Sequence, residues 1–192
     1  MRQINNFTAI CVFLLFLSCS LKNTGQSEEN AKTNKKSDKE ITSRQIEKSD
    51  KIVWLSYDEA VELSRKEPKK IFVDVYTNWC GWCKRMDATT LQDPAIVGYM
   101  NEKFYAVKLN AESNKKVNYK GTEMTEQQLA SRIFKASGYP TTVYLTPDED
   151  ILQPIPGYLD VDMLNKILHF YGDEHFKTTS WERFSKSFNS NE

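Results

Sequence analysis

The sequence has no excess of charge of either sign. Its 192 residues contain 26 lysines and arginines and 26 aspartates and glutamates, so the formal net charge is zero, and the sequence pI is about 6.7. Proteins that bind nucleic acids electrostatically need a basic face that displaces the counterions of the phosphates. The charge balance therefore argues against nucleic acid as a partner.

Cysteine and long apolar segments are also scarce. Four cysteines are too few for a disulfide-dense scaffold. The main apolar run, residues 7–17, covers 11 residues, whereas a membrane-spanning helix needs about 20. The composition thus excludes a disulfide-rich scaffold, a polytopic membrane protein and a fibrous protein. The hydrophobic fraction of 40% and the mean hydropathy of −0.59 are low for a compact domain, so we expect part of the chain not to fold.

Residues 1–18 have the pattern of a secretory signal peptide. Arg2 precedes the apolar run, whose length suits the hydrophobic region of a signal. The run ends at Ser18-Cys19, which resembles the lipobox of bacterial lipoproteins, a family in which the cysteine is diacylated and becomes the mature N-terminus. We therefore expect lipidation at Cys19 and a membrane-anchored location in the bacterial cell envelope, periplasm-facing or on the surface. Ordinary signal cleavage near Ser18 or Ser20, or an uncleaved anchor, is the alternative.

Residues 19–50 differ in composition from the remainder of the chain. From residue 20 to residue 50 there is no aromatic residue and there are only four apolar ones, Leu21, Ala31, Ile41 and Ile46. Such a stretch cannot bury enough apolar area to offset its chain entropy. We therefore predict a lipid-anchored disordered tether over 19–50, with a short helix near 41–48 as an alternative.

The sequence after residue 50 divides into a folded domain over 51–176 and a C-terminal extension over 177–192. In the extension, Trp181, Phe184 and Phe188 follow the i, i+3, i+7 spacing of one helix face. This spacing predicts a short amphipathic helix docked on the domain, and binding to a partner is the alternative.

Within the domain, short β-branched and aromatic runs alternate with helix signals. The polar segment 110–124 contains a glycine and is interpreted as a loop. The alternation predicts an α/β fold, with a central mixed sheet, helices on both faces and a C-terminal antiparallel hairpin plus helix. The predicted strands are 52–55, 71–76, 105–109, 141–145 and 151–155, and helices are predicted to begin after Ser56, near Trp79, at Pro94, after Thr125 and after Asp160 or Asp162.

Cys80 and Cys83 are separated by two residues, where a buried strand gives way to a helix. At a helix N-terminus, the dipole and the free N–H groups stabilise a thiolate, so we expect the pKa of Cys80 to fall from about 8.5 to about 7 or below. Cys83, one turn further, is expected to be more buried and to keep its proton. The pair could exchange with a substrate disulfide without a bound cofactor.

Two other interpretations of this pair remain. A closed zinc site needs four ligands, and only His169 and His175 could complete one. A purely structural disulfide would close a very small loop and would therefore stabilise the fold little.

The stretch Val73–Lys84, which includes Trp79-Cys80-Gly81-Trp82-Cys83, resembles the active-site segment of the thioredoxin superfamily. It is similar to periplasmic thioredoxin-like lipoproteins and to the thioredoxin-like domain of membrane thiol:disulfide interchange reductases. Ser137–Thr141, Lys108 and Gly157 match further parts of the family pattern. The resemblance implies a thioredoxin-like fold for the domain over 51–176.

The resemblance also implies roles for several residues. Asp74 would accept the Cys83 proton, and Lys108 would be its charge partner. Pro140 would be cis and face the cysteines, leaving the Tyr139 backbone to pair with an extended substrate. A satisfied structural carboxylate is the alternative for Asp74, and a surface lysine is the alternative for Lys108.

Trp79, Gly81 and Trp82 flank the sulfurs and are predicted to contact substrate, although either tryptophan could instead be a packing residue. Of the two, Trp79 is expected to be the more packed. The dipeptide Gly81-Trp82 differs from the Gly-Pro of thioredoxin, so the redox direction does not follow from the motif.

Together these features predict an extracytoplasmic thiol–disulfide oxidoreductase. We expect it to reduce the disulfides of cysteine-containing exported proteins and to receive electrons from a membrane donor of the thiol:disulfide interchange type. A disulfide oxidase or isomerase is the alternative within the enzyme class. A non-catalytic thioredoxin-fold binding lipoprotein is the alternative outside it.

Lipidation can be tested by replacing Cys19 with serine, which removes the thiol that would carry the lipid. Metabolic labelling with a radioactive fatty acid should mark the wild-type protein and the control Cys11→Ser, but not Cys19→Ser. Equal labelling of all three proteins would remove the proposed anchor.

Overall fold

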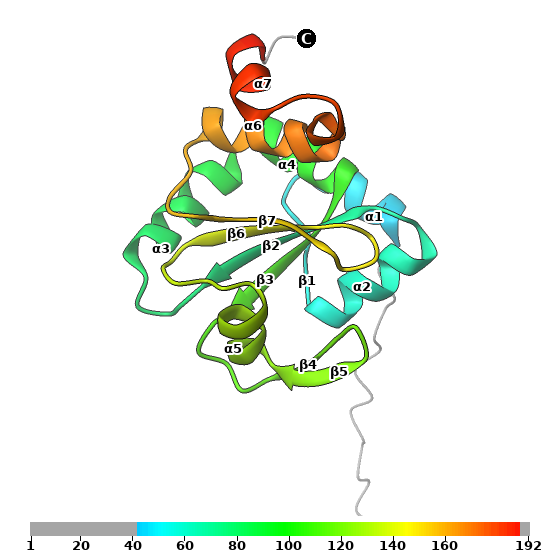
Figure 1. The fold of residues 1–192 in the computed structure, drawn as a ribbon, viewed down its shortest axis with the longest axis vertical. Helices are drawn as coiled ribbons and strands as arrows, with labels where there is room; N and C mark the ends of the chain where they lie inside the picture. The colour runs from blue at the N-terminus through cyan, green and yellow to red at the C-terminus, as the bar shows by residue number, and fades with distance from the viewer. Residues whose placement is uncertain (1–41, 189–192) are drawn as a thin grey trace, which may run out of the picture. The chain divides into compact units, whose positions relative to one another are not determined.

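The computed structural model describes residues 42–188, so the predicted signal peptide, Cys19 and most of the predicted tether lie outside the described residues. A five-stranded sheet with the order β1-β3-β2-β6-β7 forms the centre of the domain (Figure 1). β1, β3 and β2 run parallel, whereas β6 and β7 pair antiparallel. This is the predicted mixed sheet with a C-terminal hairpin.

The elements follow the predicted order closely. The strands are β1 (Trp54–Leu55), β2 (Lys70–Tyr76), β3 (Phe104–Asn110), β4 (Lys116–Tyr119), β5 (Thr122–Thr125), β6 (Thr141–Leu145) and β7 (Ile151–Pro156). The helices are α1 (Ser43–Glu47), α2 (Tyr57–Lys66), α3 (Gly81–Ala88), α4 (Pro94–Lys103), α5 (Glu126–Gln128), α6 (Val161–Gly172) and α7 (Trp181–Ser187), with short helical turns at Thr90–Gln92, Leu129–Ile133 and His175–Lys177.

Capping side chains set the starts of the principal helices. Ser56 accepts a hydrogen bond from the backbone N–H of Glu59, whose carboxylate accepts one from the backbone N–H of Ser56, and so forms a capping box for α2. Asp93 caps α4 ahead of Pro94. The Asp160 carboxylate accepts from the Met163 backbone N–H, which identifies Asp160 as the cap of α6.

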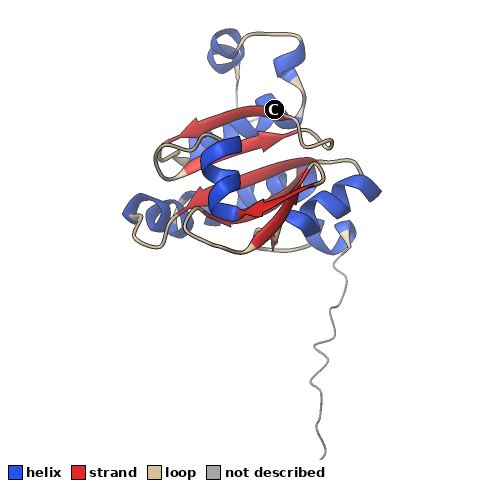
Figure 2. Cartoon of the chain, turned by 60° about the horizontal axis from the view of Figure 1, so that its bottom comes forward, coloured by secondary structure: helices blue, strands red, loops and turns tan. Residues whose placement is uncertain are grey.

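The sheet separates two hydrophobic clusters, and helices cover both faces (Figure 2). Successive side chains of a strand point to opposite faces. In β2, Ile71, Val73 and Val75 therefore pack against α2 and the segment after α5, whereas Phe72 packs against α3, α4 and α6. The same alternation places Asp74 on the face that α3 covers.

The segment 110–124, interpreted as a loop, instead contains the antiparallel hairpin β4–β5. Its turn is formed by Lys120 and Gly121, whose φ angles of 48° and 83° are both positive, as in the type I′ turn of a two-residue hairpin. Val117 is buried, but most of the hairpin is polar and exposed. Because the strands bury so few side chains, the hydrophobic pattern carried little signal. The helical segment that was predicted to begin after Thr125 does begin there and ends near Phe134.

The boundary between tether and domain at residue 51 is wrong, and the structure instead shows the alternative, a short helix within 41–48. α1 packs on the domain, with Ile46 only 1% exposed in the core and Glu47 paired to Lys69 at 2.6 Å. The Asn101 side chain then donates to the backbone carbonyls of Ser49 and Lys51. One buried side chain and a remote amide hold this segment, and neither produces a composition signal.

The C-terminal extension docks on the domain through an amphipathic helix, as predicted. Phe184 of α7 is buried, and its ring lies 5.3 Å from that of Phe170 on α6, while the Trp181 ring contacts Phe170 edge-on. Within residues 42–188, none of the helices combines the length and the hydrophobicity that crossing a membrane requires.

The contribution of α1 can be tested with Ile46→Ala. Loss of a buried isoleucine side chain should lower the free energy of unfolding by about 2–4 kcal/mol, because it removes apolar contacts and leaves a cavity. Equilibrium urea unfolding of the oxidised protein measures this change. Ile151→Ala is the matched control, since Ile151 is 36% exposed. Equal stability of the two variants would show that α1 does not contribute to the core.

Candidate active site

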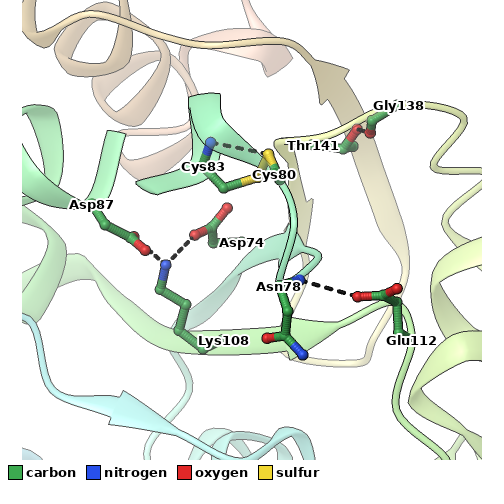
Figure 3. Close-up of a disulfide and its surroundings, with 9 residues drawn as sticks. All are labelled: Asp74, Asn78, Cys80, Cys83, Asp87, Lys108, Glu112, Gly138 and Thr141. Atoms are coloured by element: carbon green, nitrogen blue, oxygen red, sulfur yellow. Dashed lines mark hydrogen bonds and ion pairs between the residues drawn. A yellow bond between two sulfur atoms is a disulfide. The ribbon is translucent and has the colours of Figure 1, made fainter. Parts of the chain in front are cut away.

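Cys80 and Cys83 form a disulfide at the start of α3, with an S–S distance of 2.05 Å (Figure 3). Cys80 is the N-cap residue, and its Sγ accepts a hydrogen bond of 3.0 Å from the backbone N–H of Cys83. This is the expected placement of a sulfur at a helix N-terminus. The residues are almost equally buried, at 3% and 2% exposure, so the disulfide form does not show the expected stronger burial of Cys83.

A carboxylate anchors the loop that joins β2 to the disulfide. Glu112 accepts hydrogen bonds of 3.1 Å from the backbone N–H of Asn78 and from the indole Nε1–H of Trp79. Cys80 then closes a turn by donating its N–H to the Thr77 carbonyl. Sequence reasoning missed Glu112, because it lies in a polar segment with no motif.

Asp74 and Lys108 meet as the resemblance implied. They are register partners on the adjacent parallel strands β2 and β3, and Lys108 Nζ lies 2.6 Å from Asp74 Oδ2. Within residues 42–188, the other oxygen, Oδ1, is buried and has no hydrogen-bond partner. Figure 3 shows the carboxylate between Lys108 and the disulfide. One face of Asp74 is therefore neutralised and the other is available to a proton.

Burial and the ion pair have opposite effects on the pKa values of Asp74 and Lys108. Burial raises the pKa of the Asp74 carboxyl above its usual value, because desolvation outweighs the attraction of the Lys108 ammonium. Burial lowers the pKa of Lys108, but the Asp74 carboxylate and that of Asp87 more than offset this, so the pKa of Lys108 lies above its usual value. A buried carboxyl with a raised pKa can exchange a proton with a thiol near neutral pH.

Asp87, on α3, forms a second ion pair with Lys108. Sequence reasoning missed this residue, although its position four residues after Cys83 places both on one helix face. The Lys108 ammonium also lies 4.9 Å from the centre of the Trp54 ring and 5.3 Å from that of Tyr76. The lysine is therefore part of the site and not a freely solvated surface residue.

Two exposed tryptophans border the disulfide. Trp79 is 69% exposed and Trp82 is 55% exposed, so the expectation that Trp79 is the more packed of the two is wrong. The Trp79 indole is held by its hydrogen bond to Glu112 and by an edge contact with the Tyr139 ring, which leaves its face to solvent. Within residues 42–188, a Cβ added at Gly81 would meet no atom within 4 Å apart from its chain neighbours and its own helix, so there is open space beside Gly81.

The second tryptophan belongs to a separate group of side chains. The Trp82 ring lies 5.4 Å from the Tyr158 ring, and the Arg85 guanidinium lies 5.4 Å from the Trp82 ring and 5.9 Å from the Tyr158 ring. Sequence reasoning did not identify Tyr158 or Arg85. A contact between α3 and the segment after β7 becomes visible only in the tertiary structure.

The Tyr139-Pro140 peptide bond is cis, as the resemblance implied. In the part of the chain that the structure describes, the Tyr139 backbone N–H and carbonyl have no hydrogen-bond partner. Gly157 donates its N–H to the Pro140 carbonyl at 2.8 Å and has a φ of 101°, a conformation that favours glycine. This accounts for the glycine after the hairpin, and the hydrogen-bonding capacity of the Tyr139 backbone is not used by the described residues.

The arrangement combines a disulfide at a helix N-terminus, a buried carboxyl behind it and open aromatic surface around it. These parts suffice for thiol–disulfide exchange, in which one sulfur reacts with a substrate and a nearby group handles the proton of the other. The thioredoxin-like fold together with the Cys80–Cys83 disulfide supports a thiol–disulfide oxidoreductase.

Solved structures of known proteins share the fold. The chain aligns to a Helicobacter pylori thioredoxin-fold protein with a TM-score of 0.54 and 23% identity, covering 62% of this chain and 83% of that one. It aligns to a Bacteroides thetaiotaomicron protein described as a "putative disulphide-isomerase" with a TM-score of 0.53 and 25% identity, covering 69% and 98%.

Curated relatives and a family model extend the comparison. Human spermatogenesis-associated protein 20 is 35% identical over 99 residues, which cover 52% of this chain and 12% of that protein. An uncharacterized protein of Caenorhabditis elegans is 28% identical over 143 residues, 71% of this chain and 18% of that protein. The chain thus spans less than a fifth of the length of these relatives. The family model of the thioredoxin-like domain matches residues 57–172, and the chain therefore belongs to the thioredoxin-like family.

Proposed function

We propose that this protein is an extracytoplasmic protein-disulfide reductase that acts through Cys80 and Cys83. The observation that carries the proposal is the disulfide at the N-terminus of α3 with the unpartnered oxygen of the buried Asp74 behind it. The two sulfurs are within bonding distance, so they can store and release two electrons without a separate cofactor.

In the first step, the Cys80 thiolate attacks one sulfur of a substrate disulfide. A Cys80–substrate disulfide forms, the substrate S–S bond breaks, and the other substrate sulfur leaves as a thiolate. The helix N-terminus and the N–H of Cys83 stabilise the attacking thiolate.

In the second step, Asp74 accepts the proton of the Cys83 thiol. The Cys83 thiolate attacks Cys80 Sγ, the intramolecular disulfide forms, and the second substrate sulfur leaves as a thiolate. The released thiolates take up two protons in total. The substrate gains two electrons and the protein dithiol loses them.

Substrate would bind across the open surface around the disulfide. The free backbone groups of Tyr139 can pair with an extended peptide, and the exposed faces of Trp79 and Trp82 can contact its side chains. Binding through backbone groups and apolar faces suits cysteine-containing exported proteins of varied sequence.

We further propose that the protein acts in the bacterial cell envelope, anchored to the membrane through Cys19, and that a membrane donor of the thiol:disulfide interchange type reduces the disulfide after each cycle. The apolar run at residues 7–17 and the Ser18-Cys19 pair support the location. A two-electron reductant is required because each cycle oxidises the Cys80–Cys83 dithiol to a disulfide, and a dithiol donor can supply both electrons by thiol–disulfide exchange.

Activity is tested by insulin disulfide reduction with dithiothreitol as the electron source. Cys80→Ser should reduce the rate to that of dithiothreitol alone, because the attacking sulfur is absent. Cys83→Ser should retain the first step and accumulate a mixed disulfide, which non-reducing electrophoresis resolves and mass spectrometry identifies. If Cys80→Ser matched the wild type, the protein would instead be a binding module on the same fold.

The reduction potential of the Cys80–Cys83 pair distinguishes a reductase from an oxidase or isomerase. The reduction potential of thioredoxin is about −270 mV, and that of the oxidase DsbA is about −120 mV. We expect a value closer to that of thioredoxin, measured by equilibration with glutathione or dithiothreitol. A reduction potential of about −120 mV would contradict the proposal that the protein acts as a reductase.

The raised pKa of Asp74 predicts how stability depends on pH. Above about pH 4 the unfolded chain releases this proton, while the folded protein keeps it until the pH passes its higher folded pKa. Within that interval the free energy of unfolding should fall by about 1.4 kcal/mol per pH unit from this group. The stabilising contribution is thus present at low pH and lost as the pH rises through the folded pKa.

Asp74→Asn replaces the ionisable carboxyl with a neutral amide, so the variant lacks this pH-dependent loss of stability. Its free energy of unfolding, relative to that of the wild type, should therefore increase as the pH rises across the same interval. Urea unfolding of the oxidised proteins between pH 4 and pH 8 measures the difference. Asp162→Asn is the control, because the side chain of Asp162 is 68% exposed. A difference that does not change with pH would contradict the raised pKa.

A further inference from the structure

The Lys108 ammonium is shared between two carboxylates. It contacts Asp74 Oδ2 at 2.6 Å, where the Asp74 side chain is 2% exposed, and it also contacts Asp87 Oδ1, where the side chain is 41% exposed. The first ion pair is part of the proposed proton transfer. The second connects that pair to solvent and takes no direct part in the two exchange steps.

The fold places Asp87, on α3, opposite the ion pair of Asp74 and Lys108. Asp74 and Lys108 project from adjacent strands onto the face that α3 covers. Cys83 and Asp87 are one turn apart on α3, so the helix presents its sulfur to one side of the Asp74 carboxylate and its own carboxylate to Lys108 on the other (Figure 3). A change at Asp87 therefore reaches Asp74 only through Lys108 or through space.

Among residues 42–188, the other groups that the structure places near the ammonium or its Asp74 partner carry no full negative charge. The rings of Trp54 from β1 and Tyr76 from β2 attract the cation weakly by comparison with a carboxylate. Tyr144 from β6 also interacts with Asp74, and burial raises the pKa of its hydroxyl far above the neutral range, so it stays uncharged. The ammonium is thus divided between Asp74 and Asp87.

We propose that Asp87 is a positioning residue of this site, which holds the Lys108 ammonium by a second ion pair and thereby limits how strongly that ammonium stabilises the Asp74 carboxylate. A carboxylate that is less stabilised is the stronger base toward the Cys83 thiol. Burial is the main cause of the raised pKa of Asp74, and the negative charge of Asp87 raises it further. The inference rests on the dithiol exchange proposed above.

A two-phase reaction isolates the step in question. Reduced protein is mixed in a stopped-flow instrument with 5,5′-dithiobis(2-nitrobenzoate). Attack by Cys80 forms a mixed disulfide and releases one thionitrobenzoate. Cys83 then loses its proton and attacks Cys80 Sγ, which releases the second thionitrobenzoate. Cys83→Ser should show the first phase only, which assigns the second phase to the attack of Cys83 on Cys80 Sγ.

The pH profile of the second phase, measured from pH 5 to pH 9, is the readout. The acid limb of this profile is the range in which the rate rises with pH as Asp74 ionises. In Asp87→Asn the Lys108 ammonium pairs with Asp74 alone and stabilises its carboxylate more strongly, so the acid limb should move to lower pH. At low pH the second phase should then be faster than in wild type, by about tenfold for each unit that the limb moves. Lys108→Gln removes the attraction and should move the limb to higher pH. Asp87→Glu keeps the charge and should retain the wild-type profile.

Asp162→Asn is the matched control, because it removes an exposed carboxylate that pairs with Lys166 at 2.7 Å on α6 and should leave the profile unchanged. Asp87→Ala provides a second variant and should shift the limb in the same direction as Asp87→Asn. An acid limb that stays in place or moves to higher pH in both Asp87 variants would overturn the inference while leaving dithiol exchange intact. Absence of a second phase in the wild-type protein would instead remove the proposed function.

Discussion

The burial of the Asp74 carboxyl within the central sheet determines how the rest of the site is arranged. A carboxylate on a residue that is almost fully buried is costly unless a cation or a proton compensates it. The parallel register supplies the cation, since Lys108 is the β3 partner of Asp74. The compensation is incomplete, because one oxygen stays unpartnered and the pKa of the carboxyl stays raised. That imbalance is what suits Asp74 to exchange a proton with a neighbouring thiol.

α3 connects this buried pair to the reactive sulfurs. Its N-terminus holds both cysteines and supplies the N–H that contacts Cys80 Sγ, and its next turn supplies the carboxylate of Asp87. The helix thus links the two cysteine sulfurs at its N-terminus to the charged side chains of Asp74, Lys108 and Asp87. A shift of α3 relative to the sheet would disturb the two together, and the packing of Met86, on the same helix, into the core opposes such a shift.

The surface around the disulfide is assembled from segments that are far apart in the sequence. Glu112, after β3, orients Trp79, while the ring of Tyr158, after β7, contacts that of Trp82. The cis bond before Pro140 brings a third segment to the site. Each segment is tied to the scaffold by hydrogen bonds or ring contacts, so a large exposed aromatic area is presented in a defined arrangement.

The sequence by itself determined the order of the main elements, the mixed sheet and the dithiol, because strand alternation, capping residues and short motifs are local properties of the chain. The resemblance to the thioredoxin superfamily then pointed to Asp74, Lys108 and Pro140. The tertiary structure decided the rest. The burial of Ile46, the polar hairpin β4–β5 and the roles of Glu112 and Asp87 depend on contacts between residues distant in the chain, and hydrophobic periodicity carries no record of such contacts. The exposure of Trp79 belongs to the same class, since its indole is held by two remote residues, Glu112 and Tyr139.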